Sequence, residues 1–390
     1  MAGKTLRRVL VPLVIVAVLA VAAGCHVMQT IGETPSGEEV AAYEKLPYYR
    51  DGQFQSPVPL IYPGRSPNGV PALSNLPRFA WRFISRAVSG NRNAPDAPLP
   101  KVALDKSFFA AAPAELAAYW LGHSSLIVEL EGKRLLVDPV FGNAAPIPSI
   151  MGRYTSPPLA RDQLPPLDYV LITHDHYDHL EYATMRALRD WDVQFVVPYG
   201  VGAHLRKWGI APNRIHETGW GETYIGDGLT FASERTIHFS GRTFGSRNKS
   251  LWTSWSLIGR QFRVFISGDS GYGEHFRDIG AKHGPFDLAF IEIDAWNANW
   301  PRTHMFPEEV IQAYHDLGTR AMVPVHWGVF DLGGHPWNES ITKISALAAQ
   351  DAALNLLTPL MGERIVPGES ATREWWRDVP EAASDKDGGQ

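Results

Sequence analysis

The sequence predicts an α/β domain in which two β-sheets are flanked by helices. Three observations support this prediction. The 390 residues are 45% hydrophobic and 20% charged, an ordinary globular composition with a sizeable core and room for one large domain or two smaller ones. From about Ala117 onward, short apolar strand patterns alternate with helical patterns. Several of the strand patterns end at a histidine or an aspartate, at the strand end where open α/β sheets form their clefts.

The first 25 residues have the pattern of an export signal. Basic residues between positions 4 and 8 precede an apolar run from position 9 to position 23. The run ends at Ala22-Ala23-Gly24-Cys25, which resembles a bacterial lipobox, with the single cysteine of the chain at the modified position and alanine where leucine is commonest at position 22. We therefore expect an exported protein that is lipid-anchored through Cys25 in the bacterial cell envelope, with the outer membrane favoured over the inner. An uncleaved membrane anchor is the alternative.

The remaining chain divides into three parts. Residues 26–71 are rich in Pro, Gly, Ser and charge without periodicity, which predicts a tether and irregular wrapping segment. Residues 72–367 form the expected domain. Residues 368–390 are a polar C-terminal tail that we expect to fray, although Trp375 and Trp376 could dock on the domain.

Residues 76–88 predict a basic amphipathic helix. Arg78, Arg82 and Arg86 recur every four residues beside Phe79 and Phe83, a pattern that favours contact with a membrane surface. Packing of the two aromatic rings on the domain is an equal alternative, and both could hold. The net charge of −5, with acidic and basic residues interspersed, gives no footprint for a nucleic-acid partner. The oligomeric state is left open by the sequence.

Within the domain, strand patterns are bounded by turn residues. The ranges 117–121, 125–130 and 134–137 read as strands, with a turn at Glu131-Gly132 and a polar end at Asp138. The helix at 307–317 begins with proline, carries Glu308 and Glu309 near the positive end of its dipole, and is followed by Gly318. Further strands are expected at 168–173, 195–198, 230–237, 252–258, 262–267, 288–293 and 321–325, and further helices at 184–189 and 201–208.

The run from Thr173 to Leu180 has the composition of a metal site. It holds three histidines and two aspartates directly after an apolar strand pattern. Imidazole and carboxylate ligands without a nearby thiolate suit zinc and are compatible with manganese or iron. His174 and His176 project to the same side of an extended loop, whereas Asp178 and His179 follow too closely to reach the same ion. The spacing therefore indicates two metal ions.

Two ions need more ligands than this run supplies, so other strands should also end in chelating residues. Three strand patterns do so, ending at His238, Asp269 and His326. Because open α/β sheets form their clefts at the carboxyl ends of their strands, we expect these side chains to converge on the histidine cluster.

The order His-x-His-x-Asp-His, a distant His, Gly-Asp and a late His resembles the metallo-β-lactamase superfamily. Longer stretches, from about Leu76 to Gly328, resemble the branch of N-acylphosphatidylethanolamine-hydrolysing phospholipases D. The metal motif alone indicates only the superfamily, and the flanking stretches indicate the branch. These stretches are 120–125, 137–141, 164–180, 248–256, 307–310 and 324–328.

The resemblance implies a two-sheet αββα sandwich that holds two Zn²⁺ ions, with other divalent metals possible. One ion would be held by His174, His176 and His238, the other by Asp178, His179 and His326, and Asp269 would bridge them. A hydroxide between the metals would hydrolyse a phosphodiester, with N-acylated phosphatidylethanolamine or a related envelope phospholipid as substrate. His304 matches a family position near the substrate, where it could donate a proton or bind phosphate; an ordinary solvated loop histidine is the alternative.

Several neighbouring residues receive other roles. Asp138 and His123 are expected to orient the ligands by hydrogen bonds, with plain turn or core roles as the alternative. Asp175 should point away from the metals, and His315 is assigned a structural role within a helix.

Three alternatives to the phospholipase D-like activity stand beside it. Gly268-Asp-Ser-Gly271 resembles the sequence around a trypsin-like nucleophile, which would make Ser270 catalytic, but the surrounding strand order is wrong for that family. A lactonase or another dimetal hydrolase of the same fold would use the same metal site on a different bond. A non-catalytic, metal-binding envelope lipoprotein is the third alternative, and the complete ligand set argues against it.

Overall fold

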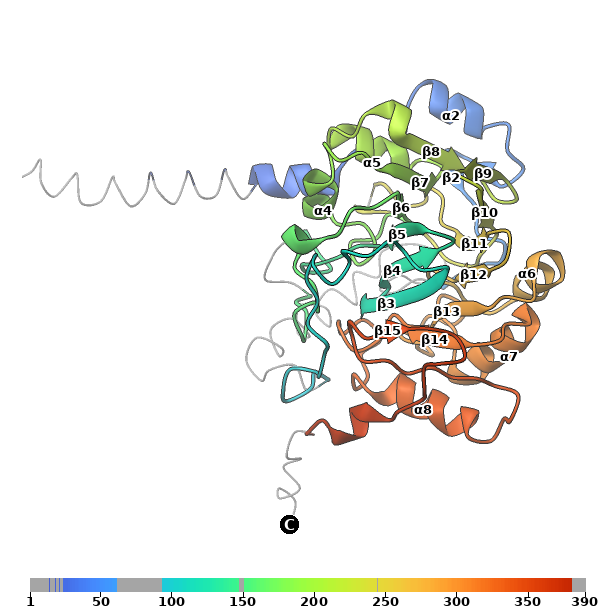
Figure 1. The fold of residues 1–390 in the computed structure, drawn as a ribbon. Helices are drawn as coiled ribbons and strands as arrows, with labels where there is room; N and C mark the ends of the chain where they lie inside the picture. The colour runs from blue at the N-terminus through green and yellow to red at the C-terminus, as the bar shows by residue number, and fades with distance from the viewer. Residues whose placement is uncertain are drawn as a thin grey trace, which may run out of the picture.

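The structure, a computed structural model, describes residues 24–61, 93–146, 151–243 and 245–380, together with Val14, Val18 and Val21. Its centre is a pair of stacked β-sheets with helices on both outer faces (Figure 1). The helix predicted at residues 76–88, with Arg78, Arg82 and Arg86, lies outside the described residues.

One sheet has seven strands in the order β15-β3-β4-β5-β6-β7-β8. Its first half is antiparallel and its second half, from β5 to β8, is parallel. Parallel strands require crossover connections, and short helices supply them between β6 and β8. The strands are β3 (Leu116–Gly122), β4 (Ser125–Leu130), β5 (Lys133–Val137), β6 (Tyr169–Leu171), β7 (Gln194–Pro198), β8 (Ile215–Thr218) and β15 (Arg364–Ile365).

The second sheet has six strands in the order β14-β13-β12-β11-β10-β9. Here β9 to β12 are antiparallel, whereas β12, β13 and β14 run parallel. The strands are β9 (Thr223–Gly226), β10 (Leu229–Glu234), β11 (Ser254–Ile258), β12 (Arg263–Ile266), β13 (Leu288–Glu292) and β14 (Met322–Val325).

The core fills the space between the sheets and the space under the helices. Trp120 and Val128 of one sheet belong to the same buried cluster as Phe231 and Trp255 of the other. Strands covered on both faces read as continuous apolar runs, and every residue of β3 and β4 is accordingly buried. The outer helices are α4 (Tyr182–Ala187) and α5 (Val201–Lys207) on the seven-stranded sheet, and α6 (His275–His283), α7 (Pro307–Leu317) and α8 (Glu339–Ala348) on the six-stranded sheet (Figure 1).

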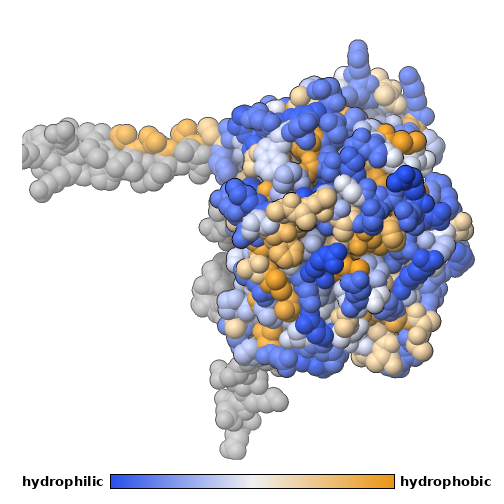
Figure 2. Space-filling model, in the orientation of Figure 1, coloured by the Kyte–Doolittle hydropathy of each residue, from blue (hydrophilic) through white to orange (hydrophobic). Residues whose placement is uncertain are grey.

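The expected wrapping segment contains short regular elements. Residues 24–31 are helical, α2 (Glu38–Tyr43) follows, and β1 (Tyr49–Arg50) pairs with β2 (Gln53–Phe54). Tyr43, Tyr49 and Phe54 pack with Trp252 in a separate aromatic cluster. Figure 2 shows hydrophilic side chains over most of one face of the body, and exposed apolar side chains along the N-terminal segment that projects from it. Within the described residues, no helix has the length and apolarity needed to cross a membrane.

Most predicted elements occur within two or three residues of their expected bounds, and β4 and α7 match residue for residue. The strand predicted at 230–237 is shorter, because β10 ends at Glu234 and the chain continues as an irregular segment with one isolated bridge from Ile237 to Gly271. At the other end of the chain, Trp375 and Trp376 dock in the core beside Trp327, and residues 381–390 lie outside the described range.

Candidate metal centre

Four segments bring chelating side chains to one edge of the two sheets. The loop after β6 carries the histidine cluster, and a tight turn shapes it, because the amides of His179 and Leu180 both donate to the carbonyl of His176, at 3.1 and 2.8 Å. Asp269 follows β12 and His326 follows β14, directly or within three residues of the strand end. The histidine cluster, Asp269 and His326 lie at carboxyl ends of strands that pair parallel with a neighbour, whereas His238, in the fourth segment, follows β10, which pairs antiparallel with both of its neighbours.

The first group joins His174, His176, His238 and Asp269. The Nε2 atom of His174 is 2.9 Å from Nδ1 of His176, and Nε2 of His238 is 3.4 Å from the same nitrogen. The Oδ2 atom of Asp269 lies 3.7 Å from Nε2 of His174 and 3.4 Å from Nε2 of His238. One ligand atom from each residue lies within 4.8 Å of the others, a spacing that suits a single cation.

The second group joins His123, Asp178, His179 and His326. The Oδ2 atom of Asp178 is 3.5 Å from Nε2 of both His179 and His326. The Oδ1 atom of Asp269 approaches the same two nitrogens, at 3.2 and 3.1 Å. Asp269 therefore presents one carboxylate oxygen to each group, which is the placement expected of a bridging ligand.

The donor set fits a cation in each group. Within the described part of the chain, Nε2 of His179, Nε2 of His326 and Oδ1 of Asp269 are buried without a well-directed hydrogen bond. Buried polar atoms that lack partners are costly, and a metal ion is one partner that these three atoms could share. The groups contain all seven predicted ligands together with His123, and the ligand roles stay predictions.

The pKa values of two site histidines, His326 and His179, are shifted by the buried carboxylates beside them. Burial opposes protonation of His326, but the carboxylates of Asp269 and Asp178 outweigh it and raise the pKa of this imidazole to about 10. His179 behaves alike, since burial is outweighed by Asp269, Asp178 and Asp138, and its pKa lies well above the ordinary value. The buried carboxylates therefore favour positive charge at these two rings, as they would favour a cation bound between them.

The surroundings hold the ligands in place. Asp138 accepts hydrogen bonds from Nδ1 of His179 at 2.8 Å and from the amide of Thr173 at 2.8 Å, and His123 pairs through Nε2 with Oδ2 of Asp178 at 3.0 Å. Asp138 and His123 thus make the hydrogen bonds expected of residues that orient ligands. Asp138, His123 and His326 have φ angles of 40°, 54° and 70°, a region that non-glycine residues rarely occupy and that clusters at functional sites.

The remaining predicted residues, His304, Asp175 and His315, lie in different surroundings. His304 lies at the site, with its ring centroid 5.1 Å from that of His238 and 5.2 Å from that of His326. Asp175 points away from the ligand atoms and accepts hydrogen bonds from His204, Ser250 and Gly241. His315 lies on the surface in a 2.6 Å contact with Asp351.

Ser270 is buried, and its hydroxyl donates to the carbonyl of Gly271 at 2.7 Å with His275 close by. A fully buried hydroxyl engaged in this way is badly placed to attack a substrate.

Glu292 belongs to the site, although the sequence analysis did not single it out. It ends β13, is fully buried, and its Oε1 lies 3.3 Å from Nδ1 of His304. The signal was present in the sequence, because Glu292 closes an apolar strand in the same way as the other site residues.

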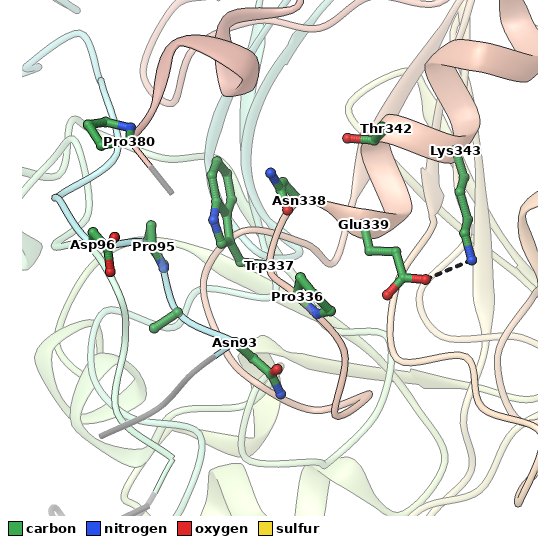
Figure 3. Close-up of a pocket in the computed structure, with 11 residues that line it drawn as sticks. Asn93, Pro95, Asp96, Pro336, Trp337, Asn338, Glu339, Thr342, Lys343 and Pro380 are labelled. Carbon is green, nitrogen blue, oxygen red and sulfur yellow. Dashed lines mark ion pairs between the residues drawn. The ribbon is translucent and has the colours of Figure 1, made fainter. Parts of the chain in front are cut away.

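A separate cavity of about 440 Å³ lies at the start of α8 (Figure 3). Trp337 stands between Pro95 and Pro380 on one side and α8 on the other, where Glu339 pairs with Lys343 at 2.7 Å. The candidate ligands do not line this cavity.

Comparison with known proteins identifies the family. Residues 133–327 match the model of the β-lactamase superfamily domain. The chain belongs to the metallo-β-lactamase superfamily. This superfamily is one of metal-dependent hydrolases, and the His/Asp groups of this chain are candidate metal-binding groups within its fold.

Individual relatives cover most of the chain. A protein of Mycobacterium tuberculosis named Uncharacterized protein Rv0906 is 38% identical over 373 residues, covering 92% of this chain and 96% of the relative. The N-acyl-phosphatidylethanolamine-hydrolyzing phospholipase D 1 of Caenorhabditis elegans is 31% identical over 280 residues, covering 68% of this chain and 78% of the relative. The resemblance to this branch, predicted from the flanking stretches, is thereby confirmed.

Two further matches concern fold and location. The structure of an isothiocyanate hydrolase from Delia radicum gut bacteria is similar with a TM-score of 0.52 at 17% identity, covering 66% of this chain and 100% of that one, which shows the shared fold. The Outer membrane protein RomA of Klebsiella pneumoniae is 46% identical over 102 residues, covering 26% of this chain and 76% of the relative. A relative with that name is compatible with an envelope location for this chain.

Proposed function

We propose that the protein is a zinc-dependent phosphodiester hydrolase of the phospholipase D type, acting on N-acylated phosphatidylethanolamine or a related envelope phospholipid. The observation that carries the proposal is the convergence of His174, His176, His238, Asp178, His179 and His326 around Asp269 in a chain that is similar over 280 residues to an N-acyl-phosphatidylethanolamine-hydrolyzing phospholipase D.

Two bound divalent ions would supply Lewis acidity and lower the pKa of water towards about 7, so that a nucleophile is present at neutral pH. The protein supplies the frame: Asp269 holds its two oxygens towards the two groups, and the buried imidazoles fix their positions. In the proposed hydrolysis, an oxygen from water forms a bond to phosphorus while the bond from phosphorus to the ethanolamine oxygen breaks. The products are phosphatidate and an N-acylethanolamine.

His304 is placed to serve the leaving group. Its Nδ1 atom lies 3.3 Å from Oε1 of Glu292, so the other ring nitrogen is the one that can approach the substrate. We propose that this nitrogen donates a proton to the leaving alkoxide or holds a phosphate oxygen, because a donor beside the developing negative charge favours departure.

We further propose that the chain is held at the membrane. Cys25 is exposed and not paired, as a lipidation site must be. A lipid chain there, with the basic segment around Arg78, Arg82 and Arg86 at the headgroups, would place the enzyme at its substrate through two signals, as stable anchoring requires. The mass of the N-terminal peptide of the mature protein tests the lipid.

The activity is tested by metal analysis of the purified protein followed by hydrolysis of N-acylated phosphatidylethanolamine in mixed micelles, with products identified by mass. We expect about two zinc ions per chain, loss of hydrolysis in chelator and recovery with zinc. His176→Ala and Asp269→Asn should abolish hydrolysis, whereas His315→Ala, which removes a surface histidine, should leave it unchanged. Absence of hydrolysis by the zinc-loaded protein, or full activity of either site variant, would refute the proposal; cleavage of a lactone instead would indicate the same centre acting on another bond.

A further inference from the structure

The N-terminal segment His26–Glu33 lies directly against the loop that carries four of the candidate ligands. A single guanidinium joins the two. On one side, Nη2 of Arg242 donates to the carbonyl of Thr30 at 2.8 Å and Nε donates to that of Ile31 at 3.2 Å. On the other side, Nη1 donates to the carbonyl of Asp175 at 2.7 Å, near the start of the ligand loop (residues 174–179), and to that of Leu180 at 2.9 Å, directly after it.

The chemistry of this link is specific to arginine. The carbonyls of Thr30 and Ile31 belong to the last turn of the helix at residues 24–31, where carbonyls have no partner within the helix and a cation is favourable. The ring of Tyr177, itself in the ligand loop, lies 3.9 Å from the guanidinium carbon and adds a cation–π contact. A planar fork with several donors can hold four carbonyls at once, which the point charge of lysine cannot.

A second, independent link runs through His204 of α5. The amide of Glu33 donates to Nδ1 of His204 at 3.1 Å, so the ring proton is on Nε2, which reaches Oδ2 of Asp175 at 3.2 Å. Asp175 stands in the chain between His174 and His176. It also accepts from Ser250 Oγ at 2.6 Å and from the amide of Gly241 at 2.7 Å, so it is the point at which these segments meet.

The segment fits closely at this place. Gly32 has a φ of +79°, which a residue with a side chain rarely adopts. A Cβ atom on Gly32 would stand 2.3 Å from Nδ1 of His204, the atom that receives the Glu33 amide. Any side chain at position 32 must therefore displace either the segment or the imidazole that holds Asp175.

We propose that residues 26–33 are part of the metal centre, where they fix the loop from His174 to His179 through two positioning residues, Arg242 and His204. Because this segment begins directly after Cys25, the docked segment also orients the catalytic edge relative to the anchoring end of the chain. The inference rests on the proposed metal centre for its functional meaning, but the mechanical coupling of the two segments exists with or without metal.

The test compares the Gly32→Ala variant with the wild type, both as the full-length chain in detergent. This variant is chosen because it leaves the amino-acid sequence of the ligand loop unchanged. Hydrogen exchange of the metal-free protein is measured over residues 26–33 and 174–180, and zinc affinity is measured by competition with a chromogenic chelator. We expect exchange to rise in both segments together and zinc affinity to fall about 10-fold, the lower limit for loss of a residue that orients ligands. We expect Arg242→Gln to give the same increase in exchange and the same loss of zinc affinity. Arg242→Lys should also give this pattern, because lysine lacks the planar fork of donors.

Lys207→Gln is the matched control, since Lys207 contacts the same segment only through an exposed pair with Glu33 at 3.2 Å. We expect it to change neither readout. If Gly32→Ala raises exchange in residues 26–33 while the ligand loop and zinc affinity are unchanged, the segment is a passive tether and the inference is wrong. Unchanged exchange in both segments would equally contradict it. A wild-type chain that binds no zinc would refute the proposed function, whereas the exchange comparison would still decide the coupling.

Discussion

Replacement of Asp138 by asparagine should weaken metal binding without unfolding the protein. The carboxylate uses both oxygens: Oδ1 accepts from the amide of Thr173 at 2.8 Å, and Oδ2 accepts from the Thr173 hydroxyl at 2.6 Å and from Nδ1 of His179 at 2.8 Å. An asparagine has one oxygen and one NH₂ group. Whichever way it is turned, the NH₂ group must face a donor, so one side of this arrangement is lost.

The expected size follows from the role of such contacts. Loss of a carboxylate that orients a metal-binding histidine costs about 10- to 100-fold in metal affinity, or about 1.4 to 2.8 kcal/mol. Zinc affinity is measured by competition with a chromogenic chelator, and circular dichroism reports the fold. Asp168→Asn is the control, because Asp168 accepts hydrogen bonds from the Arg134 amide at 2.9 Å and from Lys133 at 3.2 Å just before β6, away from the ligands. Zinc affinity of Asp138→Asn within twofold of the wild type would refute the reasoning.

Two further predictions concern stability. Phe231 is fully buried between the sheets, with its ring centroid 4.8 Å from that of Tyr169. We therefore expect Phe231→Ala to lower the free energy of unfolding by about 3 to 5 kcal/mol in denaturant melts. Ile225→Ala is the control, because this side chain is 70% exposed, and it should change the free energy of unfolding by less than about 0.5 kcal/mol. Burial lowers the pKa of His275 to about 3, so between pH 6 and pH 5 the unfolded chain takes up a proton that the folded chain does not, and stability falls with falling pH. In urea melts over that range the wild type should lose about 1 kcal/mol per pH unit more than His275→Gln, and parallel slopes would contradict this assignment.

Local signals explain which elements the sequence predicts well. β4 and α7 have the predicted bounds because their ends are marked: β4 is followed by the turn Glu131-Gly132, and α7 has Pro307 in its first turn and Gly318 at its end with a φ of 62°. By contrast, β9 is an edge strand whose alternate residues are exposed, and α6 is rich in charged and polar residues, so neither shows a strong apolar pattern. Their positions are set by tertiary packing.

The site residues that could be predicted are those marked by a local pattern, an apolar strand that ends in a chelating side chain. Strand ends at Asp269 and His326 are visible in the sequence, and the rule that found them also applies to Glu292 at the end of β13. His238 shows the limit, because its strand ends three residues earlier than predicted, and an isolated bridge from Ile237 to Gly271 pairs the segment before His238 with the segment after Asp269. The contacts of Arg242 with residues more than 200 positions away have no local pattern at all.

The charge balance of the centre connects these observations. Asp138, Asp178, Asp269 and Glu292 are four carboxyl groups buried within one small region, and buried carboxylates persist only when cations or hydrogen bonds compensate them. Asp269 and Asp178 outweigh the effect of burial and raise the pKa of both His179 and His326, which favours protons on the same ring nitrogens whose lone pairs a metal ion would need. A metal ion that bound to these nitrogens would have to displace their protons, so its binding would release protons. Asp175 and Asp138 are each held by several donors, so these hydrogen bonds fix the shape of the loop on either side of the candidate ligands.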